Sequence, residues 1–213
     1  MASDEQELRT FAGYNVYKGK GAINVKPIPP TFQTNGKSQS VDREGALLFE
    51  FAPSGKGPRE YDWTKKATFS MSVNECGEVM RSKDGASAEF LHDPGANSKF
   101  VVFWYGEGGL FPLDSDSILF SAPDAGKMTK KLKWAPTPDG KGSKEVHESI
   151  KDNVTYLYDG SLPGVFLTLS VTDKVDASGS VTYSLPVTLA EVEVIKNIMS
   201  FCLPRFLGLH KMF

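Results

Sequence analysis

The chain has 213 residues, of which 40% are hydrophobic and 11% aromatic, so it can bury the core of one domain or of two small ones. Its 24 basic and 26 acidic side chains give a net charge of −2, which excludes binding modes that need a strongly basic chain as a whole. Any contact with a polyanion must therefore come from local clusters of basic residues.

The N-terminal residues show no targeting signal. They lack the apolar segment of a secretory signal and the Arg- and Ser-rich, acid-poor composition of a transit peptide. We therefore expect either a cytosolic or nuclear protein or a chain from which an address segment has been removed, with residues 1–13 forming a flexible N-terminus. No apolar run is long enough to span a membrane, so no membrane partner is expected. Cys76 and Cys202 lie far apart without a CxxC partner, which indicates no disulfide framework.

Alternation of apolar and polar residues dominates the chain. In residues 165–171, Val165, Leu167, Leu169 and Val171 share one face, as expected for a strand with one buried side. Turn signals such as "TNGK" and "PDGKG" separate the runs. The pattern predicts strands at 14–26, 38–43, 46–52, 67–72, 87–91, 128–134, 165–172 and 180–186.

Helical spacing is clear near the C-terminus, where apolar residues recur at steps of three and four from Leu189 to Cys202. Thr188 and Glu191 have the T-x-x-E spacing of a capping box, which predicts the start of this helix. Pro204 is expected to end it, because proline cannot donate to the helical ladder.

An internal echo sets the predicted fold. "FSMSVNECGEVM" (69–80) resembles "YSLPVTLAEVEVI" (183–195), and each follows about four strands. In the first, Ser72 and Glu75 have the spacing of a second capping box. The simplest interpretation is an α+β fold of two β-β-β-β-α units with two four-stranded antiparallel sheets. Chance similarity over 12 residues is the alternative.

Two segments, 95–125 and 143–163, fit neither unit and are interpreted as insertions in one domain over 14–210. The apolar run "FVVFWY" at 100–105 should pack on the body as an extra hairpin or on a partner.

No catalytic motif is present. Nucleophile-elbow, Walker and HExxH patterns are absent, and "GEGGLF" at 106–111 lacks the spacing of a dinucleotide site. His92 and Asp93, followed by proline, are more typical of a turn than of an acid–base pair. The acidic runs lack the spacing of a calcium loop. We expect no enzyme activity, no metal and no cofactor.

Basic residues interleaved with aromatics are the informative feature. Lys131 and Lys133 should point to one side of a strand, opposite Leu132 and Trp134. "REYDWTKK" at 59–66 joins three cations to two aromatic rings. This combination suits single-stranded nucleic acid, because cations neutralise phosphates and rings stack on unpaired bases. The alternative, that the aromatics are core and the lysines solvated, is equally compatible with the pattern.

Several ordered segments resemble the Whirly family of plant single-stranded-DNA-binding proteins. They are "YNVYKGKGAINV", "REYDWTKKATFSMSVNECGEV", "EFLHDP", "GKMTKKLKWAPTPDGKG", "VFLTLSV" and "YSLPVTLAEVEVIKNIMSFCLPRFLG". The resemblance implies two four-stranded sheets packed crosswise and helices that join four protomers in a homotetramer. It also implies binding of single-stranded DNA with little sequence preference. The implied roles are genome maintenance, DNA repair and transcription in plastid or mitochondrial nucleoids, with the nucleus as a further location.

On this resemblance, the nucleic-acid-binding residues are predicted by type. The candidates for phosphate contact are Lys18, Lys20, Lys65, Lys66, Lys131 and Lys133. The candidates for base stacking are Tyr17, Trp63 and Phe69. Lys20 is the alternative candidate for assembly beyond the tetramer, since the family motif that contains it is tied to higher-order oligomers.

The chain departs from the family pattern at Gly21, where the family has alanine, and at Asn24, where it has serine. Glycine in a strand interior should make this edge more mobile. Two other functions stay open: an RNA-binding protein of the same fold, and a protein-interaction module that uses the aromatic insertion.

Overall fold

A computed structural model describes most of the chain. The described residues are 12–81, 87–93, 99–102, 113–116, 128–136, 164–173 and 179–212. The predicted N-terminal segment 1–13 falls almost entirely outside them, as do the predicted insertion 143–163 and most of the insertion 95–125.

The first sheet has four antiparallel strands in the order β1-β2-β5-β6. Its strands are β1 (Tyr14–Lys18), β2 (Gly21–Ile28), β5 (Ala46–Pro53) and β6 (Ala67–Met71). Alternation puts apolar side chains on one face, where Val25, Phe49 and Phe69 lie in register across three strands and are buried. Polar side chains of β2 and β5 therefore lie on the opposite face.

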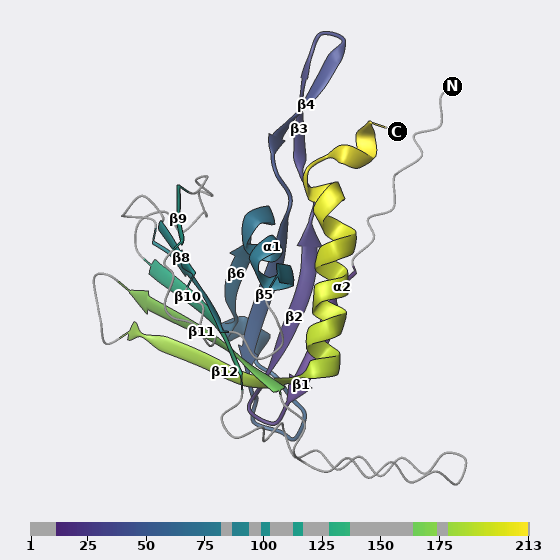
Figure 1. Cartoon of the computed structure of the whole chain (residues 1–213). Helices are drawn as coiled ribbons and strands as arrows, with labels where there is room; N and C mark the ends of the chain where they lie inside the picture. The colour runs from purple at the N-terminus through teal and green to yellow at the C-terminus, as the bar shows by residue number, and fades with distance from the viewer. Residues whose placement is uncertain are drawn as a thin grey trace, which may run out of the picture.

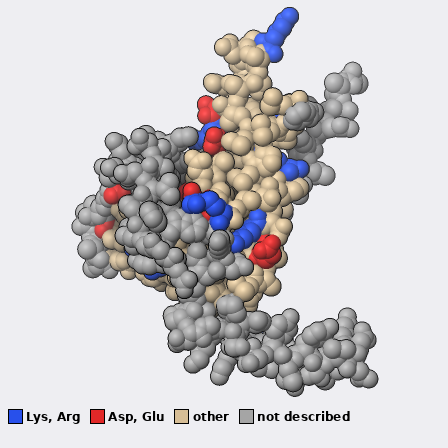
Figure 2. Space-filling view, viewed as in Figure 1, with Lys and Arg blue, Asp and Glu red and all other residues tan. Residues whose placement is uncertain are grey.

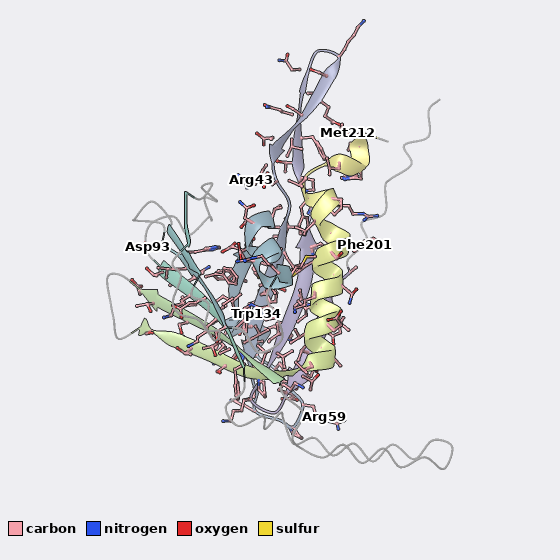
Figure 3. The ribbon with its side chains drawn as sticks, viewed as in Figure 1. Arg43, Arg59, Asp93, Trp134, Phe201 and Met212 are labelled. Atoms are coloured by element: carbon pink, nitrogen blue, oxygen red, sulfur yellow. The ribbon has the colours of Figure 1, made fainter. Side chains whose placement is uncertain are left out.

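The second sheet has four antiparallel strands in the order β12-β11-β10-β7. Its strands are β7 (Ala88–His92), β10 (Met128–Pro136), β11 (Gly164–Asp173) and β12 (Val181–Thr188). Leu132 lies in register with Phe90 and Leu169, and all three are fully buried. The core lies between the sheets, where the Phe49 and Trp134 rings make a T-shaped contact with centroids 6.1 Å apart. Trp134 is labelled in Figure 3.

Two helices complete the α+β fold. They are α1 (Val73–Arg81), which follows the first sheet, and α2 (Leu189–Phe206), which follows the second. Figure 1 shows α2 running alongside β2. The capping box of α2, Thr188 with Glu191, forms as predicted, and Ser72 and Glu75 exchange the same hydrogen bonds at α1. The predicted α+β class, with antiparallel sheets and two helices, is confirmed.

Two small ribbons lie outside the main sheets. The strands β3 (Thr31–Asn35) and β4 (Ser38–Arg43) form a hairpin that projects beyond the rest of the described chain in Figure 1. The sequence predicted β4 but missed β3. The strands β8 (Lys99–Val102) and β9 (Leu113–Asp116) pair in the segment where an extra hairpin was expected.

Residues 14–26 are not the single strand that the sequence predicted. Gly19 and Lys20 form a tight turn, and β1 folds back on β2 with Lys18 opposite Gly21. Lys18 and Lys20 therefore do not share a face, as they would in a single strand, since Lys20 lies in the turn. The apolar alternation changes parity across the turn, from Tyr14 and Val16 to Ile23 and Val25, so this change was a signal of the break.

The prediction that Pro204 ends α2 is wrong, because Pro204 lies inside the last turn of the helix. The ladder resumes beyond it, where the Leu207 N–H donates to the Leu203 carbonyl at 3.2 Å. Gly208 then adopts a left-handed conformation, with φ of 74°, and ends the helix. A short 3-10 helix, η4 (Leu209–Lys211), follows.

Gly21 is tightly packed, contrary to the expectation that it makes the edge mobile. A Cβ at this position would lie 2.6 Å from the Ala52 carbonyl oxygen and 3.3 Å from Leu185 Cδ2. We expect Gly21→Ala to lower the free energy of unfolding by about 1–3 kcal/mol, because the backbone of β5 must shift to accept a methyl group. Urea denaturation measures this effect.

Gly19→Ala is the matched control, because a Cβ at Gly19 meets nothing within 4 Å. We expect it to change the free energy of unfolding by no more than about 0.5 kcal/mol. Equal effects of the two substitutions would contradict the packing argument.

Candidate nucleic-acid interface

The turn between β1 and β2 meets the loop of residues 54–66. The Tyr61 hydroxyl donates to the Lys18 carbonyl at 3.2 Å, and the Tyr17 and Tyr61 rings stack with centroids 5.3 Å apart. The backbone N–H of Ser54 donates to the Lys20 carbonyl at 3.3 Å. These contacts bring the exposed Tyr17 ring and the half-buried Tyr61 ring to the turn that carries the exposed Lys20.

A short 3-10 helix, η1 (Trp63–Lys65), sits at the same end of the molecule. Asp62 caps it by accepting from the Thr64 N–H at 3.1 Å, and the Tyr183 hydroxyl of β12 donates to the Lys65 carbonyl at 2.7 Å. Trp63 is half-buried, while the Lys65 side chain is 75% exposed and pairs with Asp62 at 3.3 Å. We call Tyr17, Lys20, Tyr61, Trp63 and Lys65 the turn surface.

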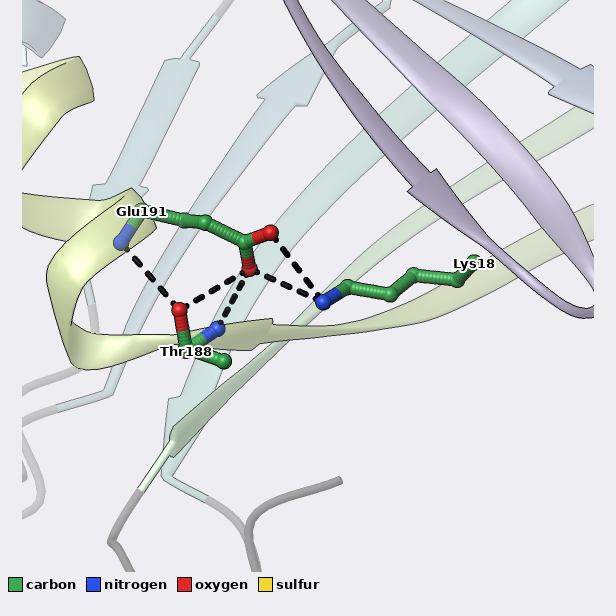
Figure 4. A network of polar contacts seen from close by, with 3 residues as sticks. All are labelled: Lys18, Thr188 and Glu191. Carbon is green, nitrogen blue, oxygen red and sulfur yellow. Dashed lines mark hydrogen bonds and ion pairs between the residues drawn. The ribbon is translucent and has the colours of Figure 1, made fainter. Parts of the chain in front are cut away.

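Lys18 does not belong to the turn surface. Its ammonium lies 3.0 Å from Glu191 Oε2, and only 7% of its side chain is exposed (Figure 4). A phosphate would have to displace the Glu191 carboxylate, whose side chain is 22% exposed, to reach this ammonium. In this structure Lys18 therefore joins β1 to the first turn of α2 and is not available as the predicted phosphate contact.

Phe69 does not have the predicted stacking role either. It is 1% exposed, and the His92 ring already stacks on it with centroids 4.2 Å apart. His92 Nε2 is in turn 2.9 Å from the buried Glu75 carboxylate. Phe69 is a core residue whose face is filled from within the protein, and a base has no access to it.

Lys66 is drawn onto the outer face of the first sheet by Glu50. This carboxylate is 8% exposed and lies 2.6 Å from the Lys66 ammonium and 2.9 Å from that of Lys26. Burial alone would raise the pKa of Glu50, but hydrogen bonds and charges from Lys66 and Lys26 outweigh it and lower that pKa. The cluster of two cations and one anion keeps a net positive charge of one.

Lys131 and Lys133 lie apart from the turn surface, on the outer face of the second sheet. Lys131 pairs with Glu89 at 3.0 Å, and within the described residues Lys133 makes no ion pair. Leu132 and Trp134 are buried on the opposite face, which confirms the predicted alternation. Hydroxyl groups surround the two lysines and bond across β11 and β12, as in the Thr168–Ser184 pair at 2.9 Å.

Sequence reasoning missed three contributors to these clusters. Tyr61 was seen only as part of an aromatic motif, because its stacking partner Tyr17 lies in a distant part of the sequence and no local pattern reveals the contact. Glu50 and Lys26 were also missed as a pair. The signal for Glu50 was a lone acidic residue inside the apolar run "LLFEFA", where a charge needs a counter-ion.

The described residues contain no group of three or more His, Cys, Asp or Glu side chains that could hold a metal ion. Neither described helix has the length and apolarity needed to cross a membrane. Burial raises the pKa of both Cys76 and Cys202, which keeps these thiols protonated and unreactive.

The fold and the turn surface define an α+β protein of two four-stranded sheets with a basic, aromatic end. A family model described as Whirly transcription factor matches residues 16–100. The crystal structure of WHY1 from Arabidopsis thaliana superposes with a TM-score of 0.68 at 31% identity, covering 96% of this chain and 90% of that one. The structure of the plant transcriptional regulator PBF-2 gives a TM-score of 0.67 at 30% identity, covering 96% and 87%. The chain belongs to the Whirly family.

Curated relatives of similar sequence support the same family membership. The chain is 31% identical over 203 residues to the single-stranded DNA-binding protein WHY1, chloroplastic, of Solanum tuberosum, covering 95% of this chain and 57% of that protein. It is 29% identical over 205 residues to the single-stranded DNA-binding protein WHY2, mitochondrial, of Arabidopsis thaliana, covering 96% and 66%. The chain thus spans less than two thirds of the length of these relatives.

The lowered pKa of Glu50 gives a prediction about acid stability. A carboxyl whose folded pKa lies below its ordinary value near 4.5 stabilises the fold above that pH, and the contribution is lost as the pH falls through the lower, folded value. We expect Glu50→Gln to lower the free energy of unfolding at pH 7 by about 1–2 kcal/mol and to reduce its loss between pH 7 and pH 3.

Urea denaturation at the two pH values measures both effects. Glu89→Gln is the control, because Glu89 is 23% exposed and its pair with Lys131 is a surface contact with a smaller contribution. A Glu50→Gln variant that loses as much stability in acid as the wild type would contradict the assignment.

Proposed function

We propose that this protein is a non-enzymatic single-stranded DNA-binding protein of low sequence specificity. The observation that carries the proposal is the turn surface, where the exposed Tyr17 ring, stacked on the half-buried Tyr61, lies at the same end of the molecule as the exposed Lys20 and Lys65. The names of the WHY1 and WHY2 relatives, which are single-stranded DNA-binding proteins, support it.

The turn surface offers both components of single-strand binding. The exposed ammonium groups of Lys20 and Lys65 can neutralise phosphates and release condensed cations. Tyr17 is 53% exposed, so its outer face can take an unpaired base while Tyr61 supports its inner face. Every base has a π face, so this mode of binding tolerates any sequence.

The other predicted contacts divide by position. We propose Lys66, with Lys26, as a flanking phosphate contact on the first sheet, and Lys131 and Lys133 as a separate one on the second. Lys18 and Phe69 are left out, because their side chains are occupied inside the fold.

We also propose that residues 14–210 form one nucleic-acid-binding domain built from two β-β-β-β-α units packed crosswise. The support is a matched pair of contacts. In each unit the glutamate of the capping box pairs with a basic side chain at the last residue of the other unit's first strand: Glu191 pairs with Lys18 and Glu75 with His92.

Self-association into a homotetramer is proposed from α2. Its outward side exposes Phe201 (62%) and Val194 (39%), which lie seven residues apart on one face, and few charged side chains appear over the upper part of this helix in Figure 2. Phe201 points away from the sheets in Figure 3, and Arg205 covers only one face of its ring. An apolar strip of this kind is typical of a protein interface.

For location and role we propose an organelle nucleoid, in a chloroplast or mitochondrion, with work in genome maintenance, DNA repair and transcription. The supports are the chloroplastic and mitochondrial names of the relatives and the similarity to PBF-2, a plant transcriptional regulator.

Fluorescence anisotropy with single-stranded and duplex 32-mers tests the main proposal. We expect preference for the single strand and an affinity that falls with salt. Lys20→Gln should reduce the slope of log affinity against log salt by about 0.7, and Tyr17→Ala should cost about 1–3 kcal/mol of binding energy with little change of slope.

Lys37→Gln is the control, because Lys37 is an exposed lysine in the turn of the projecting hairpin, at the other end of the molecule in Figure 1. It should bind as the wild type does. Equal affinity for both DNA forms would refute the proposal, and preference for RNA of the same sequence would support the RNA-binding alternative.

Phe201→Glu tests the assembly proposal. A carboxylate placed in an apolar interface loses its hydration, so we expect smaller species in multi-angle light scattering. Val181→Glu is the control, since Val181 is 46% exposed but lies at the opposite end of β12 from α2. Equal masses for the wild type and the Phe201→Glu variant would contradict the proposal that α2 forms the interface.

A further inference from the structure

We infer that Lys18 is a positioning residue that couples nucleic-acid binding at the turn surface to assembly through α2. Its ion pair with Glu191 fixes the β1–β2 turn against the first turn of the helix. This inference rests on the proposed function, because it concerns how the turn surface is held in place for its ligand.

Lys18 is attached on two sides. Its carbonyl accepts from the Tyr61 hydroxyl at 3.2 Å, which ties its backbone to the tyrosine stack. Its ammonium donates to Glu191 Oε1 at 3.1 Å and lies 3.0 Å from Oε2. The residue therefore connects the ring that supports Tyr17 to the start of α2.

Glu191 is a rigid partner because the helix cap holds it. Its Oε2 accepts from the Thr188 N–H at 2.8 Å and from the Thr188 hydroxyl at 3.1 Å, while its own N–H donates to that hydroxyl at 3.2 Å (Figure 4). A shift of the first turn of α2 must therefore move the Glu191 carboxylate, and with it the Lys18 ammonium that is paired to it.

The base of the turn has little freedom to absorb such a shift. Gly21 is packed against the Ala52 carbonyl of β5 and the Leu185 side chain of β12, whereas nothing surrounds the Cβ position of Gly19. A displacement of Lys18 is thus transmitted to the tip that carries Lys20 and not taken up by the strands.

Coupling follows from linkage. A single strand that orders the turn stabilises the Lys18–Glu191 pair and hence the position of α2, whose outward side is where protomers are proposed to meet. Assembly then favours binding to the same extent that binding favours assembly. A pair with only a structural role would change stability and leave this reciprocity untouched.

Lys18→Met and Glu191→Gln test the inference. Glutamine is compatible with a capping box, so Glu191→Gln weakens the ion pair while it keeps the cap. The two substitutions change the net charge in opposite directions, so a loss of affinity shared by both cannot be a general charge effect. We expect each to weaken binding of a fluorescent single-stranded 32-mer by about fivefold or more and to reduce the DNA-dependent change in mass seen by light scattering.

Glu75→Gln is the matched control. Glu75 closes the cap of α1 and pairs with His92, so it has the same chemistry but no contact with the turn surface. We expect its melting temperature to fall and its affinity for the single strand to stay within about twofold of wild type. The same loss of affinity in this control would overturn the inference.

If Lys18→Met does not fold, the double variant Lys18→Met/Glu191→Gln replaces it, because removal of both charges leaves no buried charge unpaired. Variants of the Lys18–Glu191 pair that melt earlier but bind and assemble as the wild type does would overturn the coupling alone. A wild-type protein that does not bind single-stranded DNA would overturn the proposed function, and the inference with it.

Discussion

Two glutamates, Glu75 and Glu191, hold the architecture together. Each accepts hydrogen bonds from the residue that caps its own helix, and each also takes a basic side chain from the sheet that its helix does not follow. Removing the basic partner of either glutamate within the intact fold would leave a largely buried carboxylate unpaired, which typically costs about 3–5 kcal/mol. Apolar burial between the sheets supplies most of the driving force but has no direction, so these two contacts give the packing its register.

The same contacts decide which basic side chains stay exposed on the surface. In the short sequence Lys18-Gly19-Lys20, the first lysine forms an ion pair with Glu191 and the second lies in the turn. Two chemically identical side chains, two residues apart, thus serve the interior and the surface. The turn surface lies at the edge of the packed core. Its Tyr61 ring is held there by a hydrogen bond that the Tyr61 hydroxyl donates to the backbone carbonyl of the buried Lys18.

Periodicity revealed the strands with one buried face, including β5, β10 and β11, because a period of two follows directly from that burial. It also contained enough information to place Phe69 correctly, since Phe69 shares its parity with the buried Met71. It failed where information is non-local. The partner of Lys18 is 173 residues away, and no local pattern distinguishes a lysine that will meet a carboxylate from one that will meet water.

Gly21 shows why a rule based on local sequence can predict the opposite of the observed effect on the mobility of a strand. Glycine weakens an isolated strand because it loses more conformational entropy on folding, and the sequence therefore indicated a mobile edge. In the fold, the missing side chain lets β2 approach the Ala52 carbonyl and the Leu185 side chain more closely than alanine would allow. The entropy lost at one residue is offset by close contact between both sheets, and this contact keeps the base of the turn firm beneath the exposed Lys20.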